Sequence, residues 1–219
     1  MNGANETPAA IGRRVLRGGI QQLRARLLHE PPPLPLKPRR SDYDLNPQNR
    51  PPLQAALTPA AVLMPLILRD EPMVLLTQRT DHLARHPGQV AFPGGRADPK
   101  DVNLVETALR ETQEETGIAP AFVTVAGFLD AYETGTGYAI LPVVGILSEG
   151  FALNAHEHEV AEIFEVPLAF LLDPANRRRD SREFRGQQRS FYAFTYEGHY
   201  IWGATAAMLV NFAERIGAP

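Results

Sequence analysis

Cysteine is absent from this chain of 219 residues. Its absence excludes disulfide frameworks, iron–sulfur clusters, thiolate-bound zinc and cysteine nucleophiles. Any metal site must therefore use oxygen or nitrogen ligands, and oxygen ligands suit hard cations such as Mg²⁺. Long hydrophobic runs are missing too, since the longest, Ala139 to Leu147, spans 9 residues and contains Pro142 and Gly145. Roughly 20 apolar residues are needed to cross a membrane, so we expect no membrane partner.

The chain also has little net charge. A formal charge of −3 gives no reason to expect a nucleic-acid partner. The N-terminus lacks the apolar core and small-residue cleavage site of a secretory signal, so the sequence predicts a cytoplasmic protein. Charge is unevenly spread, because residues 1–50 hold 9 Lys/Arg and 4 Asp/Glu whereas residues 51–219 hold 13 and 21. The chain therefore divides into a basic arm and an acidic body.

The arm, residues 1–58, combines an amphipathic pattern with many prolines. Apolar residues at helical spacing predict a helix over residues 10–29. Residues 31–38 then contain five prolines, which no helix tolerates. We expect an extended linker that wraps on the main domain or leads to it.

The body, residues 59–219, mixes strand and helix patterns. Alternating apolar residues predict strands at 61–68, 73–78, 123–129, 138–147 and 190–196. Helices are expected at 103–116, 168–172 and 204–216. A loop rich in Gly, Pro, His and Arg should occupy residues 79–102, and the basic stretch 177–189 reads as a solvated loop. Mixed strands covered by helices indicate an α+β fold.

The helix at 103–116 carries an unusual group of acids. Glu111, Glu114 and Glu115 stand at i, i+3 and i+4, so they share one face. They also lie near the C-terminal end of the helix, where the macrodipole disfavours anions. At ~4 Å and an effective dielectric constant of 20, each pair costs about 4 kcal/mol if left uncompensated. A divalent cation would remove this repulsion, whereas the simpler interpretation is a solvated acidic face with Arg110 as a local ion-pair partner.

The context of these acids decides between the two interpretations. The run Arg110-Glu111-x-x-Glu114-Glu115-x-Gly117-Ile118, preceded by Gly94-Gly95, resembles the Nudix box of Nudix hydrolases. The chain departs from the family pattern in three places. The loop has one extra residue, Val102 stands where counting back from Arg110 places the first glutamate, and Thr112 replaces an aliphatic residue. The resemblance implies an α/β/α sandwich with a mixed sheet between helices.

The preceding loop is similar to the coenzyme A pyrophosphatase branch of that family. The matching segments cover residues 75–80, 82–83, 86–89, 92–95, 98–101 and 196–206. Thr80 and Ala84 depart from the branch pattern. The resemblance covers residues 60–212 and implies hydrolysis of coenzyme A or its thioesters to 4′-phosphopantetheine and adenosine 3′,5′-bisphosphate. Two alternatives stay open: a broader diphosphatase acting on NADH, ADP-ribose or nucleotide sugars, and a catalytically silent domain that senses a ligand.

Diphosphate hydrolysis needs charge neutralisation and a directed water. Mg²⁺ or Mn²⁺ held by Glu111, Glu114 and Glu115 would supply the first, and Arg110 would orient a glutamate by bidentate pairing. Glu159 is our candidate for the general base, with Glu157 and Glu162 as rivals. A polar turn is the alternative interpretation of that segment. The residues expected to bind the anionic small-molecule substrate surround the glycine loop: Arg79, His82, Arg85, His86, Gly94, Gly95 and Arg96.

The remaining features are not assigned to the site. We expect a second arginine cluster at 177–189 to be solvated, because charge runs usually are. The aromatic residues that follow it are expected in the core rather than as platforms for adenine: Phe184, Phe191, Tyr192, Phe194 and Trp202. The sequence leaves open whether the chain forms a homodimer.

Overall fold

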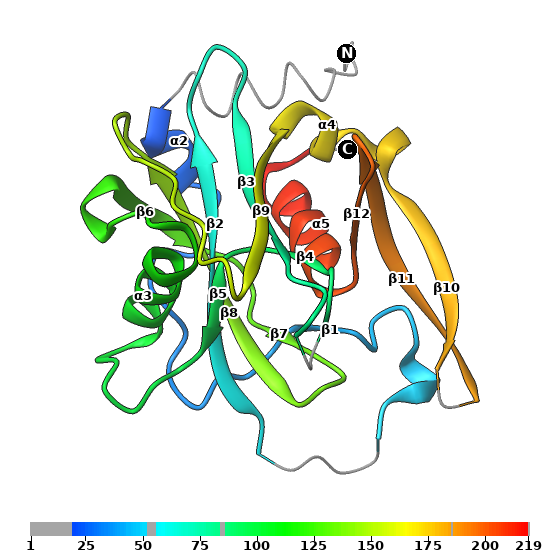
Figure 1. Cartoon of the computed structure of the whole chain (residues 1–219). Coiled ribbons are helices and arrows are strands. Elements are labelled where there is room, and N and C mark those ends of the chain that lie inside the picture. The colour runs from blue at the N-terminus through cyan, green and yellow to red at the C-terminus, as the bar shows by residue number, and fades with distance from the viewer. Residues whose placement is uncertain (1–18, 52–55, 84–85, 185, 219) are drawn as a thin grey trace, which may run out of the picture.

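A computed structural model describes residues 19–51, 56–83, 86–184 and 186–218 (Figure 1). In these segments the strands form two sheets. The larger sheet has nine strands, with β1, β7, β8, β2, β3 and β4 as neighbours in that order. Three further strands belong to this sheet but lie outside that order: β5 pairs with β2, β6 pairs with β8, and β9 pairs with β3. No helix in the described part of the chain is long and apolar enough to cross a membrane.

The strand bounds of the larger sheet follow the chain order. They are β1 (Arg40–Ser41), β2 (Thr58–Ile67), β3 (Met73–Arg79), β4 (Val90–Ala91), β5 (Gly94–Arg96), β6 (Val123–Phe128), β7 (Tyr132–Glu133), β8 (Tyr138–Leu147) and β9 (Val160–Pro167). The sheet is mixed, because β2 runs parallel to β8 over its whole length while β3 runs antiparallel to β9. The mixed sheet with helices confirms the predicted α+β class.

Helices cover both faces of this sheet, with α3 (Leu104–Thr116) on one side and α5 (Ala204–Ile216) on the other (Figure 1). Successive residues of β2 point to opposite faces. Ala61 and Leu63 pack with α3 in one buried cluster, and Met64 and Leu66 pack with α5 in another. The short helices α2 (Gly19–Arg24) and α4 (Leu168–Leu172) complete the set in the described residues. The predicted helices near 103–116, 168–172 and 204–216 are therefore confirmed.

A smaller antiparallel sheet lies beyond α5 and has three strands in the order β10, β11, β12. They are β10 (Arg178–Phe184), β11 (Gln187–Tyr196) and β12 (His199–Trp202). Phe194 and Ile201 point from this sheet into the α5 core. The prediction of a loop at 177–189 is wrong, because β10 pairs along its whole length with β11. The predicted loop at 79–102 likewise contains β4 and β5.

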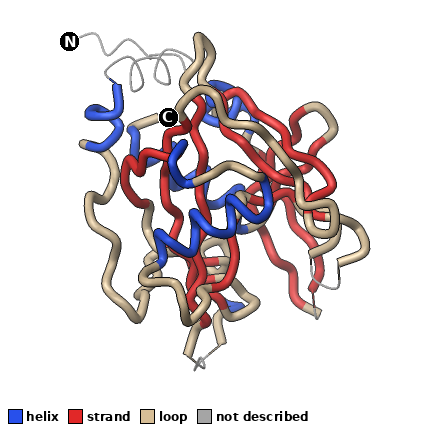
Figure 2. Tube along the Cα trace, turned by 60° about the vertical axis from the view of Figure 1, so that its left-hand side comes forward, coloured by secondary structure: helices blue, strands red, loops and turns tan. Residues whose placement is uncertain are grey.

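The described part of the arm lies along the domain, as the loop after α2 in Figure 2 shows. Leu23 and Leu27 are buried in the α5 core. The predicted helix at 10–29 ends early at Arg24, and residues 10–18 of that prediction lie outside the described residues. It ends because Leu28 and Phe128 exchange backbone hydrogen bonds of 3.0 Å. The domain boundary between residues 58 and 59 stays a prediction.

The arm also joins the two sheets. Its strand β1 pairs in parallel with β7 of the larger sheet. Five residues after the end of β1, Asn46 binds β11 of the smaller sheet through both groups of its side-chain amide. Its Nδ2 donates to the carbonyl of Ser190 at 2.8 Å, and its Oδ1 accepts from the N–H of Ser190 at 2.7 Å. One short segment therefore ties the edge of one sheet to the interior strand of the other.

Candidate active site

The acid-bearing helix α3 begins and ends on local signals. Asn103 caps its N-terminus by accepting hydrogen bonds from the N–H groups of Val105 and Glu106 at 2.9 and 3.1 Å. Gly117 ends it in the left-handed conformation, with φ of 78°. The unexpected Thr112 is buried, and its hydroxyl donates to the carbonyl of Ala108 at 2.6 Å. The hydrogen bond of this hydroxyl is therefore made within the helix itself. This allows a threonine to be buried at a position where the family pattern has an aliphatic residue.

Arg110 is held by a carboxylate that the sequence interpretation missed. Asp101 accepts from Arg110 Nε at 2.9 Å and from Nη2 at 3.0 Å, a bidentate pair. The Thr107 hydroxyl donates to the same carboxylate at 2.8 Å. The hydrogen bonds from Arg110 hold the pKa of Asp101 well below its usual range. Asp101 thus fixes the guanidinium of Arg110 from the side opposite the glutamates.

Asp101 could have been found by counting forward along the chain. Five residues separate Gly95 from Asp101, the spacing that the family pattern sets between its glycine and its first acid. The extra residue therefore lies between Asp101 and Arg110. Counting back from Arg110 instead pointed to Val102, which is 84% exposed and contacts none of these groups. The placement of Val102 at the first acidic position of the pattern is therefore corrected. Asp101, one residue earlier, is the acid of that position.

Arg110 pairs with two of the three predicted metal ligands. Its Nη1 donates to Glu111 Oε1 at 2.9 Å and to Glu114 Oε2 at 3.1 Å. The Glu114 side chain is 59% exposed, whereas that of Glu111 is 19% exposed. Arg110 was predicted to orient one glutamate through a bidentate pair. In the structure it instead shares a single nitrogen, Nη1, between the carboxylates of Glu111 and Glu114.

The glycines of β5 bring Glu111 and Glu115 to one place. The N–H of Gly94 donates to Glu115 Oε2 at 3.1 Å. A Cβ at Gly95 would lie 2.5 Å from the carboxyl carbon of Glu111, so this carboxylate packs directly on the glycine backbone. A Cβ at Gly94 would lie 2.4 Å from the Ala61 carbonyl oxygen. A side chain at Gly95 would displace the Glu111 carboxylate of α3, and one at Gly94 would collide with the backbone of β2, which explains glycine at both positions.

Burial and mutual repulsion characterise these carboxylates. The pKa of Glu115 is raised to about 8, mainly by burial and to a lesser degree by the nearby charges of Glu111 and Glu159. Burial also raises the pKa of Glu111, against the opposing effect of Arg110. Because Glu159 raises the pKa values of both, the fold brings this predicted base close to the pair. Its rival Glu162 instead lies 3.0 Å from His199 Nε2 through its Oε2. Glu157 is exposed, as Glu159 is, but it is not among the groups that shift the pKa values of the pair.

The donor chemistry of this group fits a hard divalent cation, because Glu111, Glu115 and Glu159 offer only carboxylate oxygens. Such a cation would offset the mutual repulsion that, together with burial, raises the pKa values of Glu111 and Glu115. Within the described segments no three acidic or histidine side chains are arranged to hold an ion as they stand. Rotation of Glu114 away from Arg110 would be needed to complete the predicted set of Glu111, Glu114 and Glu115.

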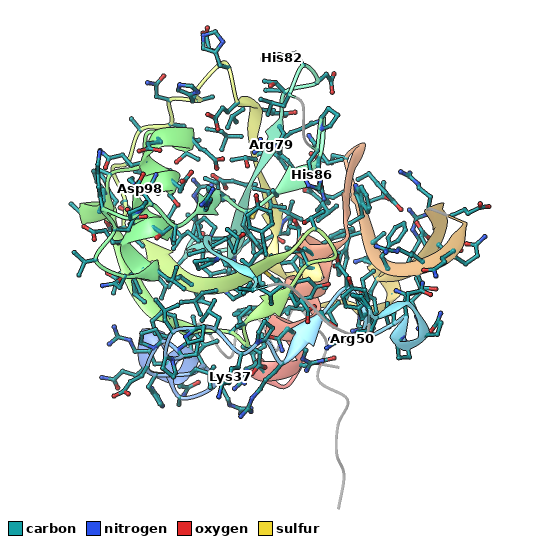
Figure 3. The ribbon with its side chains drawn as sticks, turned by 90° about the horizontal axis from the view of Figure 1, so that it is seen from below. Lys37, Arg50, Arg79, His82, His86 and Asp98 are labelled. Atoms are coloured by element: carbon teal, nitrogen blue, oxygen red, sulfur yellow. The ribbon has the colours of Figure 1, made fainter. Side chains whose placement is uncertain are left out.

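Among the predicted substrate-binding residues, Arg79 lies beside these acids, as Gly94 and Gly95 do. Arg79 ends β3, and its Nη1 lies 3.9 Å from Glu115 Oε1. Figure 3 shows Arg79, His82 and His86 gathered around the turn that follows β3. Arg96 is exposed on β5, next to the two glycines. Arg85 lies outside the described residues.

The second arginine cluster lies elsewhere, on the smaller sheet. The expectation that its aromatic residues are core is confirmed for Phe194, which is 1% exposed. It is wrong for Phe191 and Trp202, which pack against each other at 5.2 Å on the sheet face away from α5. The guanidinium of Arg182 lies 5.5 Å from the Trp202 ring centroid. This face is therefore separate from the carboxylate site.

Comparisons with known proteins agree on one family. A family profile described as NUDIX domain matches residues 57–188. An uncharacterized Nudix hydrolase NudL of Yersinia enterocolitica is 42% identical over 157 residues, which cover 72% of this chain and 80% of that protein. The Photorhabdus laumondii protein of the same name is 44% identical, with 72% and 84% covered. The solved NUDIX domain of Shewanella oneidensis NrtR with ADP-ribose is 25% identical, with a TM-score of 0.41 and coverage of 57% and 82%.

Proposed function

The chain belongs to the Nudix hydrolase family, and on this premise we propose that it hydrolyses the diphosphate bond of coenzyme A or its thioesters. The products would be 4′-phosphopantetheine and adenosine 3′,5′-bisphosphate. Mg²⁺ or Mn²⁺ as cofactor and a cytoplasmic location are parts of the same proposal.

The observation that carries this proposal is the position of the loop typical of the coenzyme A branch. Its first half ends at Arg79, which faces Glu115 across 3.9 Å. Its second half ends at Gly94 and Gly95, which contact Glu115 and Glu111. The segment that distinguishes the branch in sequence therefore borders the acids that the whole family shares. A specificity segment is expected to lie beside the reacting group, because discrimination acts on the bound transition state.

Each residue of the site has a role that follows from its surroundings. Glu111, Glu114 and Glu115 would hold the metal ion, which when bound neutralises the diphosphate and lowers the pKa of a water. Glu159 would accept the proton of the attacking water, since it lies close to both buried glutamates. Arg79 would neutralise the phosphate that leaves when the bond from phosphorus to the bridging oxygen breaks. Arg110, fixed by Asp101, keeps Glu111 in place.

A product assay tests the proposal directly. Purified protein with Mg²⁺ or Mn²⁺ would be offered coenzyme A, acetyl-coenzyme A, NADH and ADP-ribose, and the products separated by chromatography. We expect 4′-phosphopantetheine, or its acylated form, to appear fastest. Cleavage of NADH or ADP-ribose with coenzyme A untouched would refute the substrate and support a broader diphosphatase. No cleavage of any of the four would favour a silent, ligand-sensing domain.

Two variants connect the assay to the site. Glu115→Gln removes the buried negative charge with little change of shape, so we expect loss of activity with unchanged circular dichroism. Arg79→Met keeps the stem of the side chain but removes its charge, and it should lower kcat/KM for coenzyme A. Glu157→Gln serves as the matched control, because this exposed acid lies two residues from Glu159. Full activity of Glu115→Gln would refute the assignment of the metal site.

A further inference from the structure

Strand β10 leaves one edge of the smaller sheet unpaired. Among the described strands β10 pairs only with β11, and it lies at the rim of the molecule (Figure 1). A free strand edge presents a row of N–H and C=O groups to which another strand can bind. The exposed residues of β10 include Arg179, Ser181, Arg182 and Glu183. Whether this edge is protected or built for pairing depends on which groups face outward.

The hydrogen-bonding phase of β10 follows from its neighbours. In the register of the sheet Ser181 lies opposite Ser190. Both peptide groups of Ser190 are bonded to the side chain of Asn46, on the side away from β10. Ser190 and Ser181 therefore form a pair that exchanges no hydrogen bonds, and the peptide groups of Ser181 point to the free edge. Because this phase alternates, Arg179 and Glu183 present their peptide groups there as well.

The charges of β10 are self-complementary about the same residue. The sequence from 179 to 183 is Arg-Asp-Ser-Arg-Glu. If two copies of β10 run antiparallel with Ser181 opposite Ser181, then Arg179 faces Glu183 of the second copy and Asp180 faces Arg182. We propose that β10 is the interface of a homodimer, in which the two strands pair antiparallel about Ser181 and join the two three-stranded sheets into one.

Other symmetric registers are excluded by charge. The outward peptide groups of Arg179, Ser181 and Glu183 allow a two-fold axis at any residue from 179 to 183, because each such register places outward residues opposite outward residues. An axis at Arg179 or Arg182 would place two arginines directly opposite each other, and an axis at Asp180 or Glu183 would do the same with two acids. Like charges directly opposite each other destabilise an antiparallel pair. The hydrogen-bonding phase therefore permits the pairing and the charges select Ser181 as its centre, which is why a second copy fits this edge better than an unrelated strand.

The surroundings of β10 support a fixed edge rather than a frayed one. The hydroxyl of Tyr200 on β12 donates to Asp180 Oδ2 at 2.6 Å, and Arg178 lies 3.9 Å from the same carboxylate oxygen. Asn46 holds the neighbouring strand from the other side. Asp180 is thus already oriented on the outer face, where Arg182 of the second copy would meet it. A closed two-fold contact of this kind gives a dimer and does not propagate into a fibre.

Charge exchange at positions 179 and 183 tests the interface. Neither side chain is needed in the site or the core, since both are exposed on an edge strand. Sedimentation velocity of the full chain over a range of concentrations should show a dimer whose fraction falls with added salt. Arg179→Glu should give monomers, because it places glutamate opposite Glu183 twice per dimer, and Glu183→Arg should do the same. The double variant Arg179→Glu, Glu183→Arg restores complementarity and should restore the dimer.

A crosslinking experiment tests the register. The chain has no cysteine, so Ser181→Cys introduces a single thiol at the expected two-fold axis. Mild oxidation should give a covalent dimer, whereas Ala161→Cys, an exposed position on the edge strand β9, should stay monomeric. Wild-type protein that stays monomeric at every soluble concentration would overturn the proposal. So would a dimer that persists in Arg179→Glu, or equal crosslinking of the two cysteine variants.

Discussion

Removing the charge of Asp101 should weaken both the fold and the site. The Asp101 side chain is 5% exposed and makes two hydrogen bonds with Arg110, whose own side chain is 30% exposed. Hydrogen bonds to charged groups contribute roughly 1.5–3 kcal/mol. Asp101→Asn retains the shape but can accept through only one oxygen, so the bidentate pair is lost. We expect the free energy of unfolding to fall by about 2 kcal/mol, toward the middle of that range.

The measurement is urea unfolding followed by the fluorescence of the single tryptophan, Trp202. Asp98→Asn is the matched control, because Asp98 lies in the same loop and its side chain accepts from the N–H of Lys100 at 2.8 Å through one oxygen, which asparagine can also do. Its effect should stay within about 0.5 kcal/mol. A change in Asp101→Asn no larger than in this control would refute the idea that Asp101 anchors Arg110.

The same variant should affect catalysis through Arg110. Once released from Asp101, the guanidinium can swing toward Glu114 and leave Glu111, which it now holds at 2.9 Å. A misplacement of about 1 Å can reduce a rate about 100-fold. The double variant Asp101→Asn, Arg110→Lys should then lose less than the sum of the two single losses, because both changes disturb one interaction. Additive losses in kcat/KM would show that the two residues act separately.

Other predictions follow from single contacts. Gly95→Ala should reduce kcat by about 100-fold with little change in KM, because its Cβ would lie 2.5 Å from the Glu111 carboxyl carbon. Glu159→Gln should lower kcat by about 10²–10⁴-fold, as loss of a general base does, whereas Glu162→Gln should not. Chelation by EDTA should abolish activity, and added Mg²⁺ should restore it. Burial alone would raise the pKa of Asp130, but hydrogen bonds from Arg215 and Asn211 lower it. The stabilisation by Asp130 is therefore full above its unfolded pKa of about 3.9 and lost as the pH falls through its folded pKa, so Asp130→Asn and wild type should converge in stability in acid.

Local signals made parts of the fold predictable from sequence. Helix α3 was found because Asn103 and Gly117 mark its ends and its apolar residues repeat at helical spacing. Strand β10 was missed for the opposite reason. Its residues are mostly charged, and only the backbone pairing with β11 makes it a strand. A strand at the edge of a sheet needs no apolar pattern, since charged residues are common there.

In the candidate site, too, features set by local sequence were predictable and features set by tertiary contacts were not. The acids of α3 are neighbours in the chain, so their spacing alone predicted a shared face. The proximity of Glu159 to Glu111 and Glu115 depends on the path of the chain into β9, and the sequence, which favoured Glu159, left Glu157 and Glu162 as close rivals. Asp101 was readable from its distance to Gly95, but an insertion shifted it from the position expected relative to Arg110. Contacts set by tertiary structure were therefore the ones that sequence reasoning could not rank.

The two hydrogen bonds between Asn46 and Ser190 affect the order in which contacts can form while the chain is being synthesised. These two residues are 144 positions apart. A ribosome adding about 5–20 residues per second makes Ser190 roughly 7–30 s after Asn46. Throughout that interval the segment after β1 has no partner on β11, and its polar groups are bonded to water. The segment around Asn46 is thus fastened later than β1, which can pair with β7 as soon as Tyr132 and Glu133 are made. A nascent chain that stalls before β11 would hold β1 in place but leave Asn46 without its partner.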